Sequence, residues 1–112
     1  MKKHWTHYAD HIIENIDHLN RVRSDIADID KYNASLRYLQ TLSEATQKLP
    51  QKFKDDHPEI LWQDISDFRN ILVHDYLGEI EPDTIKEIID SHLEPLRAAV
   101  KNMLDKERGT AA

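Results

Sequence analysis

The chain of 112 residues has no cysteine, only two glycines and only four prolines. Without cysteine, neither disulfides nor thiolate metal sites can form. So few turn-forming residues argue against many short strands and favour a few long helices. No apolar run approaches the roughly 18 residues of a membrane span, and none follows the basic residues near the N-terminus as it would in a signal peptide. We therefore expect one cytoplasmic domain over residues 1–112, with no membrane partner.

The sequence also has fewer basic than acidic residues. Lys and Arg number 15 against 21 Asp and Glu, which gives a formal net charge of −6. Affinity for nucleic acid comes mostly from neutralising phosphates, so this balance does not favour general nucleic-acid binding. Contact with RNA would need a local basic strip, for which Lys48, Lys52, Lys54 and Arg69 are candidates. Scattered, solvated lysines explain the same residues equally well.

What the chain does have is apolar residues at spacings of three and four, the period of an amphipathic helix. This pattern predicts an all-α, up-and-down bundle of four to five helices. The helical segments are expected at 5–29, 34–49, 59–74 and from 82 onward, with a break or kink at Pro95 and a fifth segment behind it. Residues 51–58 are expected to form a surface connection, and the tail at 107–112 is expected to fray.

The stretch FRNILVHDYLG, residues 68–78, crowds four polar groups into the end of one predicted helix. With about 100° per residue, Arg69, Asn70 and His74 fan away from the core stripe expected at Leu61, Ile65, Phe68 and Leu72. Such groups are most often solvated surface. An aliphatic Val73 between them suggests instead that a second subunit covers this side.

The wider pattern resembles a known family. The segment HPEI, residues 57–60, is followed by the pattern Arg-Asn-x3-His-x-Tyr-x-Gly, residues 69–78. Together they are similar to the signature of HEPN-domain ribonuclease toxins of the HepT-like family. YLQTLSEATQKLP, residues 38–50, and IDSHLEPLRAAV, residues 89–100, resemble the segments on either side of that signature. The likeness covers about residues 36–104.

The resemblance implies a HEPN-like bundle that forms a homodimer through the motif helix, with a metal-independent endoribonuclease site where two motifs meet. It implies Arg69 and His74 as the catalytic pair, Asn70 as the polar residue beside Arg69, and Glu44 as the acid that orients Arg69. Cellular RNA is the implied substrate, and no cofactor or metal is implied. The implied partner is a MntA-like nucleotidyltransferase antitoxin of a type VII-like toxin–antitoxin system, which silences the toxin by adding AMP to Tyr76.

The residue types suit that chemistry. RNA carries its own nucleophile in the 2′-hydroxyl group, histidine can move protons near neutral pH, and arginine matches phosphate oxygens with a fork of donors. One His per motif supplies one proton-transfer group, so a two-fold dimer would supply both. Ser43 and Asp75 stand where the family often has glycine, and the charge of Asp75 near the scissile phosphate would moderate activity.

Other interpretations remain open. The chain could be a non-catalytic HEPN module that docks a nucleotide or a substrate for a nucleotidyltransferase, or a plain helical dimerisation protein; the acidic balance slightly favours both. Growth arrest on expression of the chain alone would support only the toxin. His7 and His11 have a spacing that can chelate a divalent metal, although a solvated surface is the better explanation.

Overall fold

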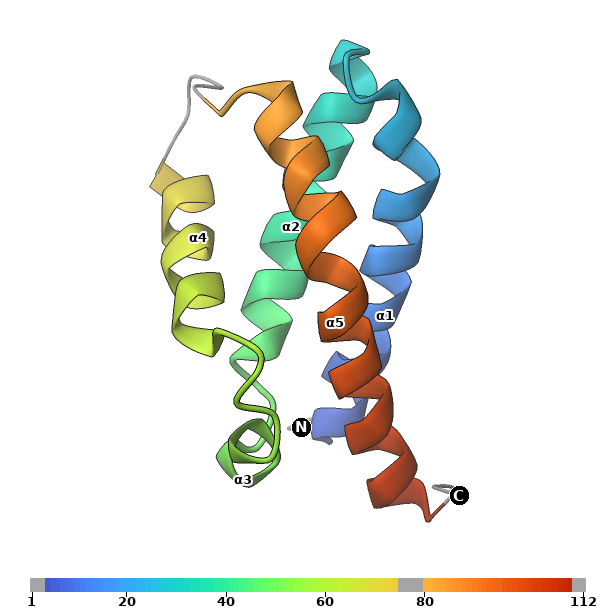
Figure 1. Ribbon diagram of the computed structural model, residues 1–112, viewed down its shortest axis with the longest axis vertical. Coiled ribbons are helices and arrows are strands. Elements are labelled where there is room, and N and C mark those ends of the chain that lie inside the picture. The colour runs from blue at the N-terminus through green and yellow to red at the C-terminus, as the bar shows by residue number, and fades with distance from the viewer. Residues whose placement is uncertain (1–3, 75–79, 110–112) are drawn as a thin grey trace.

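The computed structural model describes residues 4–74 and 80–109, and every regular element within them is helical (Figure 1). The all-α prediction is therefore confirmed. None of the helices in these ranges is long and apolar enough to cross a membrane. In chain order the elements are α1 (Trp5–Val22), the 3-10 turn η1 (Arg23–Asp25), α2 (Ile29–Thr46), α3 (Gln51–Asp55), α4 (Trp62–His74) and α5 (Pro82–Arg108).

The boundary between the first two helices, which the sequence left open within residues 25–33, lies earlier than expected. α1 ends at Val22 and α2 begins at Ile29, so the end expected near 29 and the start expected near 34 are both wrong. The start of α2 is set by a local cap at Asp28, whose side chain accepts hydrogen bonds from the backbone N–H groups of Asp30 and Lys31 at 3.0 and 3.2 Å. Aspartate is among the preferred N-cap residues because its oxygen satisfies N–H groups that have no partner within the helix.

Residues 51–58 are more ordered than expected, because they contain the short helix α3. Pro50 stands at its N-cap with an extended backbone. The ring of Phe53 packs against the ring of Trp5, with 5.1 Å between the ring centroids. This contact with the start of α1 explains why a polar and charged stretch is held in a helix, and a local sequence pattern does not reveal it.

α5 continues through Pro95 as one helix, which contradicts the expected break and separate fifth segment. Proline removes one backbone hydrogen bond and crowds the preceding turn. However, Pro95 lies on the exposed side, while Leu93 and Leu96 on either side of it are buried. The helix extends to Arg108 and ends at Gly109 in the left-handed conformation (φ 67°), so residues 107 and 108, expected to fray, are helical.

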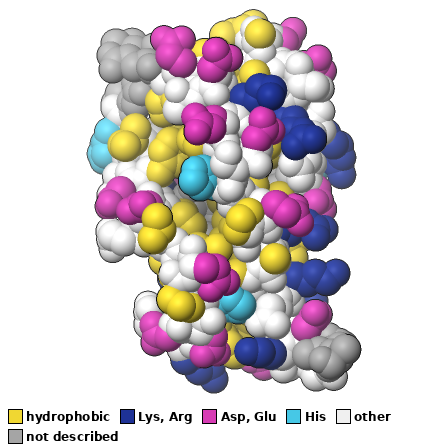
Figure 2. Space-filling view, in the orientation of Figure 1, with side chains coloured by type: hydrophobic (Ala, Val, Ile, Leu, Met, Phe, Trp, Pro, Cys, Tyr) yellow, Lys and Arg dark blue, Asp and Glu magenta, His cyan; other side chains and the backbone are white. Residues whose placement is uncertain are grey.

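The core lies where α1, α2 and α5 meet, and α2 and α5 both pack mainly against α1 (Figure 1). α4 packs on α2 at the edge of this core. No residue of α4 is fully buried: Ile65, Phe68 and Leu72 are partly buried against the core. Leu61, just before α4, is 65% exposed, so its expected place in the core stripe is wrong. Hydrophobic side chains show at the surface along the line between α4 and α5 (Figure 2).

Hydrogen bonds fix the chain on both sides of α4. His57 pairs through Nδ1 with Glu59 at 3.0 Å and through Nε2 with Asn102 of α5 at 3.1 Å. The indole N–H of Trp62 donates to the carbonyl groups of Lys54 and His57, both at 3.2 Å. Burial lowers the pKa of Lys54, and the hydrogen bond from His57 lowers the pKa of Glu59. These contacts tie the segment before α4 to α5 and set where α4 begins.

On the other side of α4, the chain returns to the core at Ile80. The buried Tyr32 of α2 donates a hydrogen bond from its hydroxyl group to the carbonyl oxygen of Ile80. Both ends of the segment that carries the motif are therefore attached to the core. Among the described residues, α2 is the main helix against which α4 packs.

Candidate functional site

Arg69 lies on the side of α4 that faces α2. One terminal nitrogen of its guanidinium donates to Oδ1 of Asn70 at 3.1 Å, and the other lies 3.5 Å from Oε1 of Glu44 on α2. The Nε atom is buried and has no hydrogen-bond partner among the described residues. About a third of the side chain (34%) is exposed. A buried donor without a partner is costly, and such groups in native structures often have a functional reason.

Glu44 is itself held by a neighbour. Gln40, one turn earlier on α2, donates from Nε2 to the same Oε1 atom of Glu44 at 3.4 Å. An ion pair as exposed as that of Arg69 with Glu44 stabilises a fold by only about 0.2–1 kcal/mol. The chain of contacts therefore matters for the direction of the guanidinium more than for stability. Sequence analysis missed Gln40, although its position four residues before Glu44 was a usable signal.

Asn70 and His74 lie on the outward side of α4, and both are exposed. They are four residues apart, hence about one turn along the same face. Among the residues that the structure describes, no hydrogen bond joins His74 to Arg69 or Asn70. Ile71, which is 52% exposed, and the partly buried Val73 flank them. The outward face of α4 thus has polar groups in its centre and aliphatic groups at both edges.

The structure brings together three of the five predicted site residues: Arg69, Asn70 and Glu44. His74 closes the same helix one turn beyond Asn70. Tyr76, the expected site of AMP addition, lies outside the described residues.

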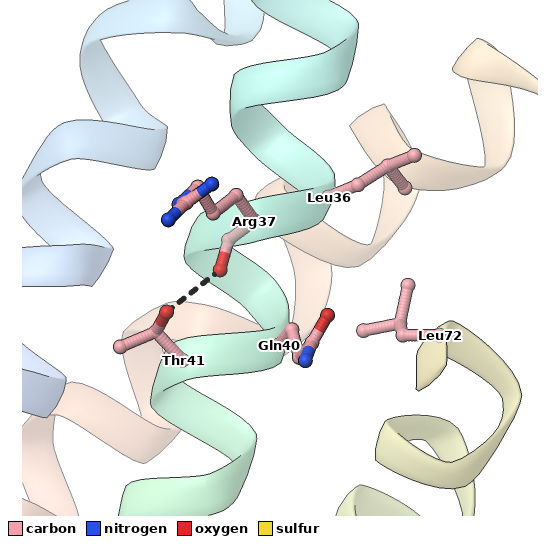
Figure 3. A pocket seen from close by; sticks show the side chains of 5 residues that line it. All are labelled: Leu36, Arg37, Gln40, Thr41 and Leu72. Atoms are coloured by element: carbon pink, nitrogen blue, oxygen red, sulfur yellow. Dashed lines mark hydrogen bonds between the residues drawn. The ribbon is translucent and has the colours of Figure 1, made fainter. Parts of the chain in front are cut away.

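Two hollows lie along the outer face of α2. The first, of about 370 Å³, is bounded by α2 and α4: Leu36 and Gln40 lie on the side of Leu72, while Arg37 and Thr41 lie on the other side of α2 (Figure 3). The second, of about 250 Å³, lies between α1 and α2 and is called the ring pocket below. It is lined by His7, Tyr8, His11, Thr41, Glu44, Ala45 and Lys48.

The two hollows are neighbours on α2. Thr41 lines both of them, and Gln40 of the first is hydrogen-bonded to Glu44 of the second. In the ring pocket, the imidazoles of His7 and His11 lie with centroids 4.6 Å apart. Within residues 4–74 and 80–109, no group of three or more His, Asp or Glu residues is arranged to hold a metal ion, so the two-histidine spacing gains no third ligand there.

A family model described as ribonuclease HepT-like matches residues 6–103, most of the chain. The chain belongs to the ribonuclease HepT-like family. This confirms the family to which the motif pointed, and with it a nuclease as the class of protein. The matched region of this HepT-like chain contains α1 to α4 and most of α5.

Individual relatives agree with the family assignment. A protein of Caldanaerobacter subterraneus whose name carries RNase as a provisional assignment is 30% identical over 107 residues, which are 90% of this chain and 95% of the relative. A protein of Thermococcus cleftensis named "Probable ribonuclease HepT" is 31% identical over 100 residues, which are 81% of this chain and 91% of the relative. No solved structure matches the chain significantly.

Proposed function

We propose that this HepT-like protein is a metal-independent endoribonuclease whose active site forms where the α4 helices of two copies meet. The observation that carries the proposal is the guanidinium of Arg69, which Glu44 and Asn70 orient and which keeps a third of its surface exposed. It lies on the same short helix as the exposed His74. A directed, permanently charged donor beside a group that can move protons is what cleavage of a phosphodiester requires.

In the proposed reaction, the 2′-oxygen of RNA attacks the adjacent phosphorus atom while one imidazole takes the proton of the 2′-hydroxyl group. The bond from phosphorus to the 5′-oxygen breaks, and a second imidazole gives a proton to that oxygen. The products are a 2′,3′-cyclic phosphate and a 5′-hydroxyl end. Arg69 stabilises the negative charge that develops on the phosphate oxygens. His74 of each copy supplies one of the two imidazoles.

The outward face of α4 supports a dimer. A bundle helix normally buries one apolar stripe, yet α4 contains no fully buried residue. Ile71 and Val73 are placed to pack against a second copy at the two edges of this face, with Asn70 and His74 between them. A two-fold axis through it would bring the two His74 side chains toward one cleft.

In the biological role we propose, the protein is the toxin of a type VII-like toxin–antitoxin pair. The partner that the motif's resemblance implies is a MntA-like nucleotidyltransferase, which would silence the toxin by adding AMP to Tyr76. Tyr76 follows Arg69 by seven residues in the sequence. The added phosphate would carry negative charge toward Arg69 and compete with the RNA phosphate for it.

Two observations favour a second candidate, a non-catalytic HEPN module that docks a nucleotide for such a partner. The net charge is −6, and Glu44 already engages the guanidinium of Arg69. Both features weaken the affinity for a polyanion such as RNA.

Cleavage by the purified protein separates the two candidates. We expect wild-type protein to cut single-stranded RNA in the presence of EDTA, to leave cyclic phosphate ends, and to spare a 2′-O-methyl strand that lacks the nucleophile. Arg69→Ala and His74→Ala should each abolish cleavage. His92→Ala, which removes an exposed imidazole from α5, is the matched control and should cut normally. A folded His74→Ala protein that still cuts RNA at the wild-type rate would refute the proposal, and EDTA-sensitive cleavage would refute metal independence.

A further inference from the structure

The ring pocket gathers three rings and a cation on the surface of an acidic protein. The centroids of His7 and His11 lie 4.6 Å apart, and the ring of Tyr8 meets that of His7 edge-on at 5.5 Å. These three residues come from consecutive turns at the start of α1. Lys48 lies at the opposite wall, just beyond the end of α2.

The ring pocket is adjacent to the site proposed for catalysis. Glu44 lines the pocket and also lies 3.5 Å from the guanidinium of Arg69. The pocket therefore begins one side chain away from the group proposed to hold the scissile phosphate. An RNA strand that passes Arg69 and continues across α2 would reach the pocket with its next nucleotide.

We propose that the ring pocket binds the nucleotide next to the cleaved phosphate of single-stranded RNA; this rests on the proposed function. The base stacks on the rings of His11 and its neighbours, and a flanking phosphate pairs with Lys48. Proteins that hold single strands combine aromatic platforms with cations in this way, because every base offers a flat face and every link a charge. Glu44 does not oppose this arrangement strongly, since Arg69 and Gln40 already engage its carboxylate.

The chemistry of the pocket walls favours a nucleotide over other occupants. A metal ion would need more ligands than the two imidazoles, and the described residues offer no such set. An apolar helix would place a hydrophobic stripe against Lys48 and Glu44, which are charged and exposed. In a nucleotide, the base can stack on the rings while the phosphate pairs with Lys48.

Binding is measured with a fluorescein-labelled, 12-nucleotide 2′-O-methyl RNA of mixed sequence, followed by fluorescence anisotropy. This probe cannot be cut by the proposed mechanism, so affinity is read without turnover. His11→Ala should weaken binding by about 5- to 150-fold, the range found when one stacking side chain is removed. Lys48→Ala should also weaken binding, and it should reduce the slope of log affinity against log salt by about 0.7, the value for one phosphate contact on a single strand.

Matched controls isolate the pocket. His92→Ala and Lys86→Ala remove one exposed imidazole and one exposed ammonium group from α5, and neither should change the affinity. A probe of the same length with abasic sugars in place of nucleotides should bind His11→Ala as well as it binds the wild type. An equal loss on the abasic probe would overturn the stacking role, because no base is present to stack.

The binding experiment and the cleavage experiment can fail separately. If His11→Ala and Lys48→Ala bind the probe as tightly as the wild type does, while the wild type cuts RNA in a manner that requires His74, the inference is wrong and the proposed function stands. If the wild type cuts no RNA but the two variants lose affinity as expected, the pocket is a nucleotide-binding site and the catalytic proposal fails. Both substituted side chains are exposed, so circular dichroism should show native helix content in each variant.

Discussion

Replacing Ile71 by alanine should weaken the proposed dimer without unfolding the single chain. Full burial of an isoleucine side chain is worth about 1.5–3 kcal/mol. Because 52% of Ile71 is exposed in the single chain, a partner that covers it would gain about half of this, or about 0.8–1.5 kcal/mol per subunit. Two-fold symmetry doubles the effect to about 1.6–3 kcal/mol. At about 1.4 kcal/mol per factor of ten, the dissociation constant should rise about 15- to 150-fold.

Sedimentation velocity over a dilution series gives the dissociation constant of each variant. The control is Ile29→Ala. Ile29 opens α2 and is 66% exposed, so it resembles Ile71 in chemistry and exposure but does not lie on α4. Ile29→Ala should dimerise like the wild type, and both variants should unfold at nearly the wild-type temperature because neither side chain is part of the buried core.

Three results would refute this reasoning at different points. A wild type that stays monomeric at all concentrations would exclude the dimer altogether. A normal dissociation constant for Ile71→Ala would move the interface away from this edge of α4. Equal weakening by Ile29→Ala would mean that loss of any exposed isoleucine promotes dissociation, and that α4 has no special part in it.

Further outcomes are expected around the motif. Tyr76→Phe should keep most of the ribonuclease activity but gain no mass when incubated with the nucleotidyltransferase partner and ATP; intact-mass spectrometry checks this, and modification of the variant would point to another residue. Glu44→Gln should change the free energy of urea unfolding by less than about 1 kcal/mol yet slow RNA cleavage, because Arg69 loses its charged partner; unchanged cleavage would exclude an orienting role. Since the folded pKa of Glu59 lies below its ordinary value of 4.5, its stabilising effect is present above that pH and is lost as the pH falls through the folded pKa. Glu59→Gln should therefore make the melting temperature fall less steeply as the pH is lowered. An unchanged fall would contradict the stabilising hydrogen bond between His57 and Glu59.

The sequence pattern predicted best where one helix face decides the structure. Ile12, Ile16 and Leu19 of α1 and most apolar residues of α5 lie in the core as their spacing indicated. Ile29, the last residue of the first predicted stripe, is 66% exposed. The pattern failed where a single contact or a single side chain decides the local structure. The start of α2 depends on the cap at Asp28, and the existence of α3 depends on the packing of Phe53 on Trp5. The continuity of α5 depends on which side of the helix Pro95 occupies, which the residue type alone does not state.

The candidate site shows the same division. Arg69 and His74 stand out within one short stretch because their spacing is local. Glu44 is 25 residues away from Arg69 in the chain, and only the resemblance to a family connected the two before the fold was known. The ring pocket depends on how α1 and α2 lie beside one another, which no local spacing encodes. The family assignment is confirmed, while the catalytic roles of the site residues remain predictions.

Because α4 is only partly buried, the activity of the protein should depend strongly on its concentration. A helix with no fully buried residue is expected to open locally more often than the core helices, and its amide hydrogens should exchange with solvent faster than those of α1 and α5. Pairing with a second copy would hold this helix closed as well as complete the cleft. At low expression most chains would then be single, with a loosely held motif and half a site. Well below the dissociation constant, the concentration of paired chains rises with the square of the total concentration, so doubling the protein would raise RNA cleavage about fourfold. If the protein is the proposed toxin, a cell would tolerate a trace of unsilenced protein and still be arrested by a modest excess.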